Sequence, residues 1–351
     1  MTKPKTSSGF STLNLEETIN AILNFIDRDR EKEVVSRRFG LFDRKETLEQ
    51  IGELLGITRE RVRQLEKAIV TKLKNAAKEG KLDSLEEAQD NILEIIKTNG
   101  SVMKISQLAD LLTKDGTKID QARLSFIAEL APKLANIEES DHYFSSTADR
   151  ELYDEKTIRE QASKIVEIIR KQIGKPCDIK EVAELYGSED TTHIEAVASI
   201  SKDLAHLNGK WGYIKWPTVN PKNIRDKIYV ILSEKGSHMH FNEIAASIRE
   251  SDFKRKDVTT QAIHNELIKD KRFVLIGRGI YALDEWGYKK GTVADIISDV
   301  LKKAGEPLHR DEIVKRVLKT RHVKETTILL NLQGKDQFKR VAKATYALAE
   351  A

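Results

Sequence analysis

Four side chains near the start of one predicted helix have the chemistry that reads DNA bases. They are Arg59, Glu60, Arg63 and Gln64, in the stretch TRERVRQLE. Arginine bonds the guanine edge through two hydrogen bonds, glutamine pairs with adenine, and glutamate accepts a hydrogen bond from cytosine. Helices that enter the major groove present such residues near their N-terminus. The set therefore indicates a DNA-reading helix, with a solvated amphipathic helix as the alternative.

The reading residues follow a short helix and a tight turn. Thr47, with Gln50 three residues later, forms a capping box, which predicts that a helix begins there. Gly56 ends that helix, and Thr58 is placed to cap the next one, over residues 59–78. Two helices joined by the short Leu-Gly-Ile-Thr turn are typical of a helix-turn-helix.

One side of the second helix is apolar and the other is charged. At about 100° per residue, a narrow stripe faces the core and the four reading residues lie on the opposite arc. The stripe consists of Val62, Leu65, Ile69 and Leu73. The positive charge continues toward the C-terminal end, where the candidate contacts to DNA phosphates are Lys67, Lys72 and Lys74.

Composition limits the classes of protein that the chain can belong to. The net charge of +4 over 351 residues is weakly basic, so a nucleic-acid surface must be local. The single cysteine, Cys177, excludes an intramolecular disulfide framework and a cysteine-based zinc site. No apolar run approaches the roughly 18 residues of a membrane span. We expect a flexible tail over residues 1–12, no signal peptide, no membrane partner, and a cytoplasmic, nucleoid-associated protein.

The residue patterns of catalysis and cofactor binding are missing. Gly277 and Gly279 lack the third glycine and the following helix of a phosphate-binding loop. His238 and His240 have no cysteine or acidic partner that completes a metal site. We therefore predict no enzyme activity, no catalytic residues, no cofactor and no metal.

A pattern recurs along the rest of the chain. HFNEIAASI (240–248) is repeated as HRDEIVKRV (309–317), and GRGIYAL (277–283) is repeated as AKATYAL (342–348). Two weaker copies precede them, around CDIKEVAEL and MKISQLADL. The pattern predicts four units, called repeats one to four, over residues 84–148, 155–217, 222–286 and 291–351.

Each repeat is predicted to run helix, short strand, helix, helix and a hairpin of two short strands. This is the order of the winged helix, a variant of the helix-turn-helix. The predicted fold is mainly α: a helix-turn-helix domain over residues 13–80, then a tandem array of about four winged-helix domains with short β-hairpins. Arg278 and Lys343 lie at hairpin turns and are candidate wing contacts to DNA, whereas Tyr281 and Tyr346 are expected to pack inside the hairpins.

The N-terminal segment resembles region four of primary bacterial sigma factors. The resemblance is carried by EVVSRRFGL (33–41) and TLEQIGELLGITRERVRQLE (47–66), and it covers residues 14–78, under a quarter of the chain. Nothing before residue 14 resembles the core-binding and promoter-melting regions of a sigma factor. We therefore expect a reading domain without the rest of a sigma factor.

The sigma resemblance implies partners and residue roles. It implies that the four reading residues contact the upstream promoter hexamer in double-stranded DNA. It also implies that Thr47 and Leu48 lie near the phosphate backbone. The helices of residues 14–54 are implied to dock on the flap of the RNA polymerase β subunit.

Repeats three and four resemble the HARE winged-helix family, to which the N-terminal domain of the RNA polymerase delta subunit is similar. The resemblance rests on PLHRDEI (307–313) with TYAL (345–348), and on GRGIYAL. That family is associated with polymerase binding and with DNA-linked enzymes. The partner of the repeats, DNA or protein, therefore stays open.

Three functions fit these patterns. The first is a non-catalytic DNA-binding transcription factor that engages promoter DNA, RNA polymerase or both. The second is a polymerase-associated scaffold that binds DNA without sequence preference. The third is the recognition component of a DNA modification or restriction system, which only the HARE associations favour.

Overall fold

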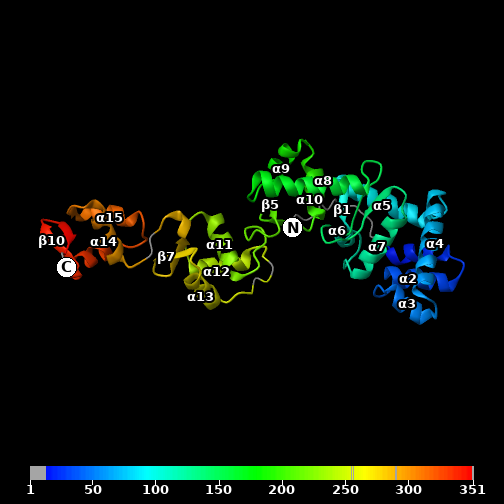
Figure 1. Cartoon of the computed structure of the whole chain (residues 1–351), viewed down its shortest axis with the longest axis horizontal. Helices are drawn as coiled ribbons and strands as arrows, with labels where there is room; N and C mark the ends of the chain where they lie inside the picture. The colour runs from blue at the N-terminus through cyan, green and yellow to red at the C-terminus, as the bar shows by residue number, and fades with distance from the viewer. Residues whose placement is uncertain (1–12, 254, 256, 289–290, 350–351) are drawn as a thin grey trace. The chain divides into compact units, whose positions relative to one another are not determined.

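The chain forms two compact units, Met1–Lys215 and Trp216–Ala351. The computed structural model describes residues 13–349 except 254, 256, 289 and 290. The predicted flexible tail, residues 1–12, lies outside the described residues. Both units are helical with small antiparallel sheets (Figure 1), which confirms a mainly α fold.

The first unit begins with a helix-turn-helix segment. Its helices are α1 (Leu15–Asn24), α2 (Asp29–Phe39), α3 (Leu48–Leu55) and α4 (Arg59–Lys78). Thr47 and Gln50 form the predicted capping box at the start of α3, and Thr58 caps α4 by accepting from the Arg61 amide. Gly56 ends α3 in the left-handed conformation with φ of 61°, which glycine adopts without steric strain. These three local predictions are confirmed.

The predicted apolar stripe of α4 faces the interior. Val62, Ile69 and Leu73 are at most 4% exposed, and Leu65 is partly buried. Val62 packs with Val34 of α2 and Ile51 of α3 in a small cluster that holds the helix-turn-helix together. Ile69 and Leu73 belong to a larger core further along the helix. The charged arc is left on the surface.

Four groups of helices, each closed by a pair of short antiparallel strands, follow α4; the early short strand is present in repeats one, three and four. The assignment of these groups to winged-helix domains stays a prediction. Repeat one comprises α5 (Asp83–Thr98), β1 (Val102–Lys104), α6 (Ile105–Leu112), α7 (Lys118–Leu130), β2 (Leu134–Ile137) and β3 (Ser146–Asp149). Repeat two comprises α8 (Glu155–Glu167), which continues into the π-helical η1 (Ile168–Ile173), then α9 (Ile179–Tyr186), α10 (Thr191–Ile200), β4 (Leu204–Leu207) and β5 (Lys210–Tyr213).

The second unit holds the other two repeats. Repeat three comprises α11 (Ile224–Lys235), β6 (Met239–His240), α12 (Phe241–Glu250), α13 (Thr260–Lys269), β7 (Phe273–Gly277), β8 (Ile280–Leu283) and the 3-10 turn η2 (Asp284–Trp286). Repeat four comprises α14 (Val293–Ala304), β9 (Leu308–His309), α15 (Arg310–Leu318), α16 (Glu325–Gly334), β10 (Phe338–Ala342) and β11 (Thr345–Leu348).

A small antiparallel sheet closes each repeat. In repeats one, three and four the early short strand pairs with the last strand of the hairpin. In repeat two a single bridge between Cys177 and Trp211 takes the place of that strand. Tyr281 and Tyr346 are 2% and 7% exposed, which confirms that they pack inside their hairpins.

One hydrophobic core is shared by the helix-turn-helix segment and repeat one. Phe39 of α2 packs on Phe126 of α7 with ring centroids 4.7 Å apart. Arg123 of α7 is 8% exposed; its Nε donates to the Leu41 carbonyl at 2.8 Å and its Nη2 to the Glu16 carboxylate at 2.9 Å. Residues on both sides of the domain boundary predicted between residues 80 and 84 therefore pack in the same core.

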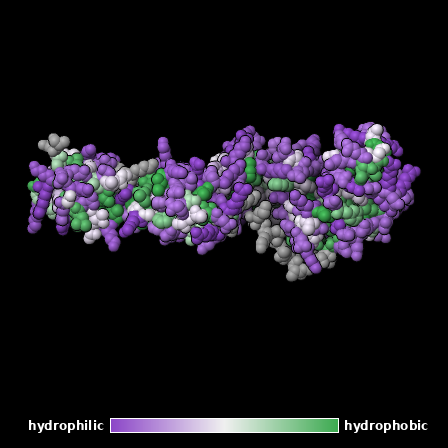
Figure 2. All heavy atoms as spheres, turned by 90° about the horizontal axis from the view of Figure 1, so that it is seen from below, coloured by the Kyte–Doolittle hydropathy of each residue, from purple (hydrophilic) through white to green (hydrophobic). Residues whose placement is uncertain are grey.

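The surface is mainly hydrophilic on the face drawn in Figure 2. Exposed large apolar side chains lie on helices and in loops and include Phe42, Leu54, Leu152, Ile268 and Leu330. Isolated apolar side chains of this kind are normal on a protein surface. Among the described residues, no helix is long and apolar enough to cross a membrane.

Candidate nucleic-acid interface

A close contact between α3 and the following turn sets the position of α4. The Ile57 amide donates to the Gly52 carbonyl at 2.9 Å, which folds the turn back onto α3. Gly52 is buried, and a Cβ placed on it would lie 2.7 Å from the Ile57 carbonyl oxygen. A glycine is therefore needed at this point of α3 for the turn to be so tight.

The structure brings the four predicted reading residues together on the first two turns of α4. Arg63 forms a two-pronged pair with Glu60, Nη2 to Oε1 at 2.6 Å and Nε to Oε2 at 2.8 Å. Gln64 donates to the same carboxylate at 3.3 Å. Arg59 pairs instead with Glu49 of α3 at 2.6 Å. The cluster therefore presents guanidinium, carboxylate and amide groups side by side.

The cluster is charged and open to solvent. The side chains of Arg59, Glu60 and Arg63 are 69%, 57% and 55% exposed. The hydrogen bonds from Arg63 lower the pKa of the Glu60 carboxyl, and the same pair raises the pKa of Arg63. Both groups stay ionised at neutral pH and can exchange their mutual hydrogen bonds for bonds to base edges.

Two of the predicted phosphate contacts have protein partners instead. Lys72 pairs with Asp27, just past α1, at 2.7 Å, and this pairing lowers the pKa of the Asp27 carboxyl. Lys74 pairs with Glu129 of α7. Lys67 is exposed on the same side of α4 as the reading cluster. The geometry therefore favours Lys67 over the other two lysines as a phosphate contact.

The two residues predicted to lie near the DNA phosphate backbone, Thr47 and Leu48, are at the N-terminal end of α3. Thr47 is exposed as the N-cap, and Leu48 is half-buried against the small helix-turn-helix cluster. Glu49, next in the chain, was missed by sequence reasoning although it pairs with Arg59. Its partner lies on another helix, so spacing within one helix gives no signal for it. Arg38 and Glu66, 3.1 Å apart, were missed for the same reason.

The two candidate wing contacts both lie at hairpin turns. Arg278 is exposed between β7 and β8, and the adjacent Gly279 has a φ of 72°. Lys343 is exposed between β10 and β11, beside Ala344 with a φ of 54°. These positions confirm the predicted turns, and a role in DNA contact stays a prediction.

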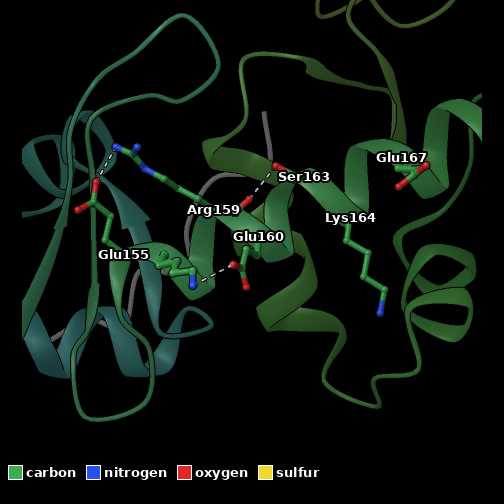
Figure 3. A pocket seen from close by; sticks show the side chains of 7 residues that line it. Glu155, Arg159, Glu160, Ser163, Lys164 and Glu167 are labelled. Atoms are coloured by element: carbon green, nitrogen blue, oxygen red, sulfur yellow. Dashed lines mark hydrogen bonds and ion pairs between the residues drawn. The ribbon is translucent and has the colours of Figure 1, made fainter.

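Other surface features have structural explanations. A shallow hollow along α8 is lined by that helix alone, and two ion pairs join its side chains, Glu155 with Arg159 and Lys156 with Glu160 (Figure 3). Cys177 is buried, and burial raises the pKa of its thiol to about 11, so this cysteine is an unreactive core residue. Within the described residues no group of three His, Cys, Asp or Glu side chains is placed to hold a metal.

Known proteins similar to this chain match the segment that carries the reading cluster. Residues 28–75 match the family Sigma-70, region 4. Over 61 residues, 17% of this chain, the sequence is 48% identical to the RNA polymerase sigma factor sigB of Arabidopsis thaliana. The chain spans only 11% of the length of that relative.

Among solved structures, bacterial selenocysteine-specific elongation factor EF-Sec is similar at 15% identity. The similarity covers 76% of this chain and 39% of that chain, with a TM-score of 0.21. A TM-score this low carries no argument about fold or function.

The match defines the class of the N-terminal segment. The Sigma-70 region 4 match at residues 28–75 contains α2, α3 and most of α4, including the whole reading cluster. The match supports a DNA-binding, transcription-related role for this segment. The HARE resemblance of repeats three and four stays a prediction.

Proposed function

We propose that this chain is a non-catalytic transcription factor that binds promoter-like double-stranded DNA through α4 and also binds RNA polymerase. The observation that carries the proposal is the exposed reading cluster Arg59, Glu60, Arg63 and Gln64 at a capped helix N-terminus behind a tight turn. Base-reading side chains occupy this place on a recognition helix. Thr47, Leu48 and Lys67 contact the phosphate backbone of the DNA and thereby position α4.

Removing one reading side chain tests the proposal. Arg63→Ala is expected to cost about 1 to 3 kcal/mol of binding to a preferred site, roughly 5- to 150-fold, because a two-bond contact to guanine is lost. The measurement is a competition gel shift on the best site selected from random duplexes. Binding to unrelated duplexes should change much less.

Arg61→Ala is the matched control for this test. Arg61 is exposed on the same turn of α4 and is not one of the four predicted reading residues; its Nη1 donates to Gln64 Oε1 at 3.4 Å. The control removes the same charge and should keep the site preference. Equal effects of the two variants, or a wild-type chain with no preferred site, would contradict base reading by α4.

We propose that the RNA polymerase contact, at the β-subunit flap, uses the outer surface of the helices between residues 28 and 55. The large apolar residues of α1 are buried in the core shared with repeat one, so they are not free to bind a partner. Two large apolar side chains nearby remain accessible: Phe42 is 42% exposed and Leu54 is 55% exposed. They are suited to an apolar contact with a partner protein.

A charged residue at this surface should prevent the polymerase contact. Leu54→Asp is expected to reduce recovery of polymerase in a pull-down at least about tenfold, because an unpaired carboxylate in an apolar interface is strongly unfavourable. Leu152→Asp is the control, since Leu152 is 59% exposed and follows repeat one. Undiminished recovery with Leu54→Asp would move the polymerase contact to another surface.

We also propose that the four repeats are winged helices, of the HARE type in repeats three and four. The proposal is supported by the order helix, strand, helix, helix and hairpin in repeats one, three and four, and by the antiparallel pairing of the early strand with the hairpin. In a helix-turn-helix the second helix lies in the major groove, so we expect the third helix of each repeat, and the hairpin that follows it, to face a duplex.

A further inference from the structure

Repeats one and two use their third helices for packing within the chain. α7 buries Phe126 and Ile127 in the core shared with the helix-turn-helix segment. α10 lies against repeat one: His193 of α10 is hydrogen-bonded to the Gly100 carbonyl at 2.7 Å. A Cβ on Gly100 would lie 2.6 Å from the Thr192 carbonyl oxygen, so the contact is tight. The sides of α7 and α10 that make these contacts are therefore not available to an outside partner.

The hairpins of repeats one, two and three are also engaged within their units. In the loop between β2 and β3, the Phe144 amide donates to the Ile200 carbonyl at 2.9 Å. In repeat two, Lys210 pairs with Asp178 at 2.6 Å. In repeat three, the edge strand β7 accepts a hydrogen bond at its Ile276 carbonyl from repeat four, at 3.1 Å.

The hairpin of repeat four is different. β10 is the edge of its sheet, and after the buried Phe338 every residue of the strand is exposed. Three of the exposed side chains on β10 and its turn are cations, called here the basic hairpin: Lys339, Arg340 and Lys343. Among the described residues, no ion pair joins one of these three cations to a carboxylate.

The charge of the whole chain is concentrated in this repeat. Of the 60 Lys and Arg, 12 lie in residues 291–351, and of the 56 Asp and Glu, 8 lie there. Repeat four therefore carries +4, whereas residues 1–290, with 48 of each sign, carry no net charge. A cationic repeat that ends in an exposed cationic hairpin complements a polyanion.

We propose that the basic hairpin binds the phosphate backbone of duplex DNA, as a second contact that is independent of base reading by α4. The hairpins of repeats one to three have contacts within their units. In the described residues, the hairpin of repeat four has both an exposed edge strand and exposed cationic side chains. The three side chains sit on an extended two-stranded ribbon, a shape that a DNA groove admits. Arg278, on the hairpin of repeat three, is not part of this contact.

A competing explanation for the cations is protection of the sheet edge. Charged residues, lysine above all, prevent edge strands from pairing with other chains. That role predicts that neutral side chains at these positions cause self-association and leave DNA binding unchanged. DNA contact predicts the reverse, so one set of variants separates the two roles.

The test is the salt dependence of binding to a duplex of random sequence. The full chain is compared with the variant Lys339→Gln, Arg340→Gln, Lys343→Gln by fluorescence anisotropy at a series of KCl concentrations. Each lost phosphate contact should lower the slope of log K against log salt by about 0.9, so a loss of about 2 to 3 is expected. The affinity at low salt should fall at least about tenfold.

The matched control removes the same charge from the same repeat at other elements: Lys302→Gln, Lys303→Gln, Lys319→Gln. All three lysines are exposed, on α14 and at the end of α15. A slope equally reduced in both variants would overturn the proposal, as would an unchanged slope with self-association on size exclusion, or a full chain that does not bind random duplex. Because the duplex has no preferred site, failure of base reading by α4 leaves this result unaffected.

Discussion

Replacing Phe126 with alanine is expected to destabilise the helix-turn-helix segment together with repeat one, by about 3 to 5 kcal/mol. Phe126 is fully buried on α7, and its ring packs on Phe39 of α2. The lost side chain leaves a cavity in a core to which both segments contribute. If that core is one cooperative structure, the two segments lose stability by the same amount.

Amide hydrogen exchange measured by mass spectrometry resolves the two segments. In Phe126→Ala, the protection of α2 and α4 should fall as much as that of α5 and α7. Phe144→Ala is the control, because Phe144 is 38% exposed in the hairpin loop of the same repeat, and its loss should cost about 1 kcal/mol or less. Loss of protection confined to α5–α7 would show that the helix-turn-helix folds by itself.

The shared core also determines how polymerase binding is best tested. Deleting residues 1–80 would remove the partners of Phe126 and Arg123 and leave apolar surface of repeat one in water. A lost interaction in such a deletion would then report misfolding as readily as a missing contact. Single exposed positions such as Leu54 avoid this ambiguity, since their side chains support little of the core.

Local features of the fold were predictable because their causes lie within a few residues. The capping box of Thr47 with Gln50 and the left-handed Gly56 need only neighbouring backbone groups. The burial of Val62 and Ile69 follows from helical period alone. The pairing of Glu60 with Arg63 was also readable from their three-residue spacing, although only their separate base-reading roles were predicted.

The features that sequence reasoning missed depend on segments far apart in the chain. The packing of Phe39 on Phe126 and the pair of Lys74 with Glu129 each join two residues more than 50 positions apart in the chain. Periodicity shows that α7 has apolar residues, but it does not show which neighbour covers them. The phosphate role predicted for Lys74 rested on helix position alone, and the structure adds a carboxylate that competes for its charge.

Replacing Gly52 with valine is expected to abolish site preference and to destabilise the α3–α4 pair by about 2 to 3 kcal/mol. Any Cβ at this buried position meets the Ile57 carbonyl oxygen at 2.7 Å and the Arg59 amide nitrogen at 3.5 Å. Backbone atoms of the turn must move to admit it. The start of α4 moves with them, and the reading cluster loses its position relative to α3.

Glu53→Val is the matched control for this substitution. Glu53 is the next residue of α3 and is exposed, so the same β-branched side chain enters the same helix without a clash. Hydrogen exchange of α3 and α4 should be nearly unchanged in the control and clearly faster in Gly52→Val. Binding to random duplex should survive in both variants, because the basic hairpin lies in the other compact unit. If Gly52→Val kept its site preference, the geometry of this turn would not control base reading, and the role assigned to α4 would have to pass to another element.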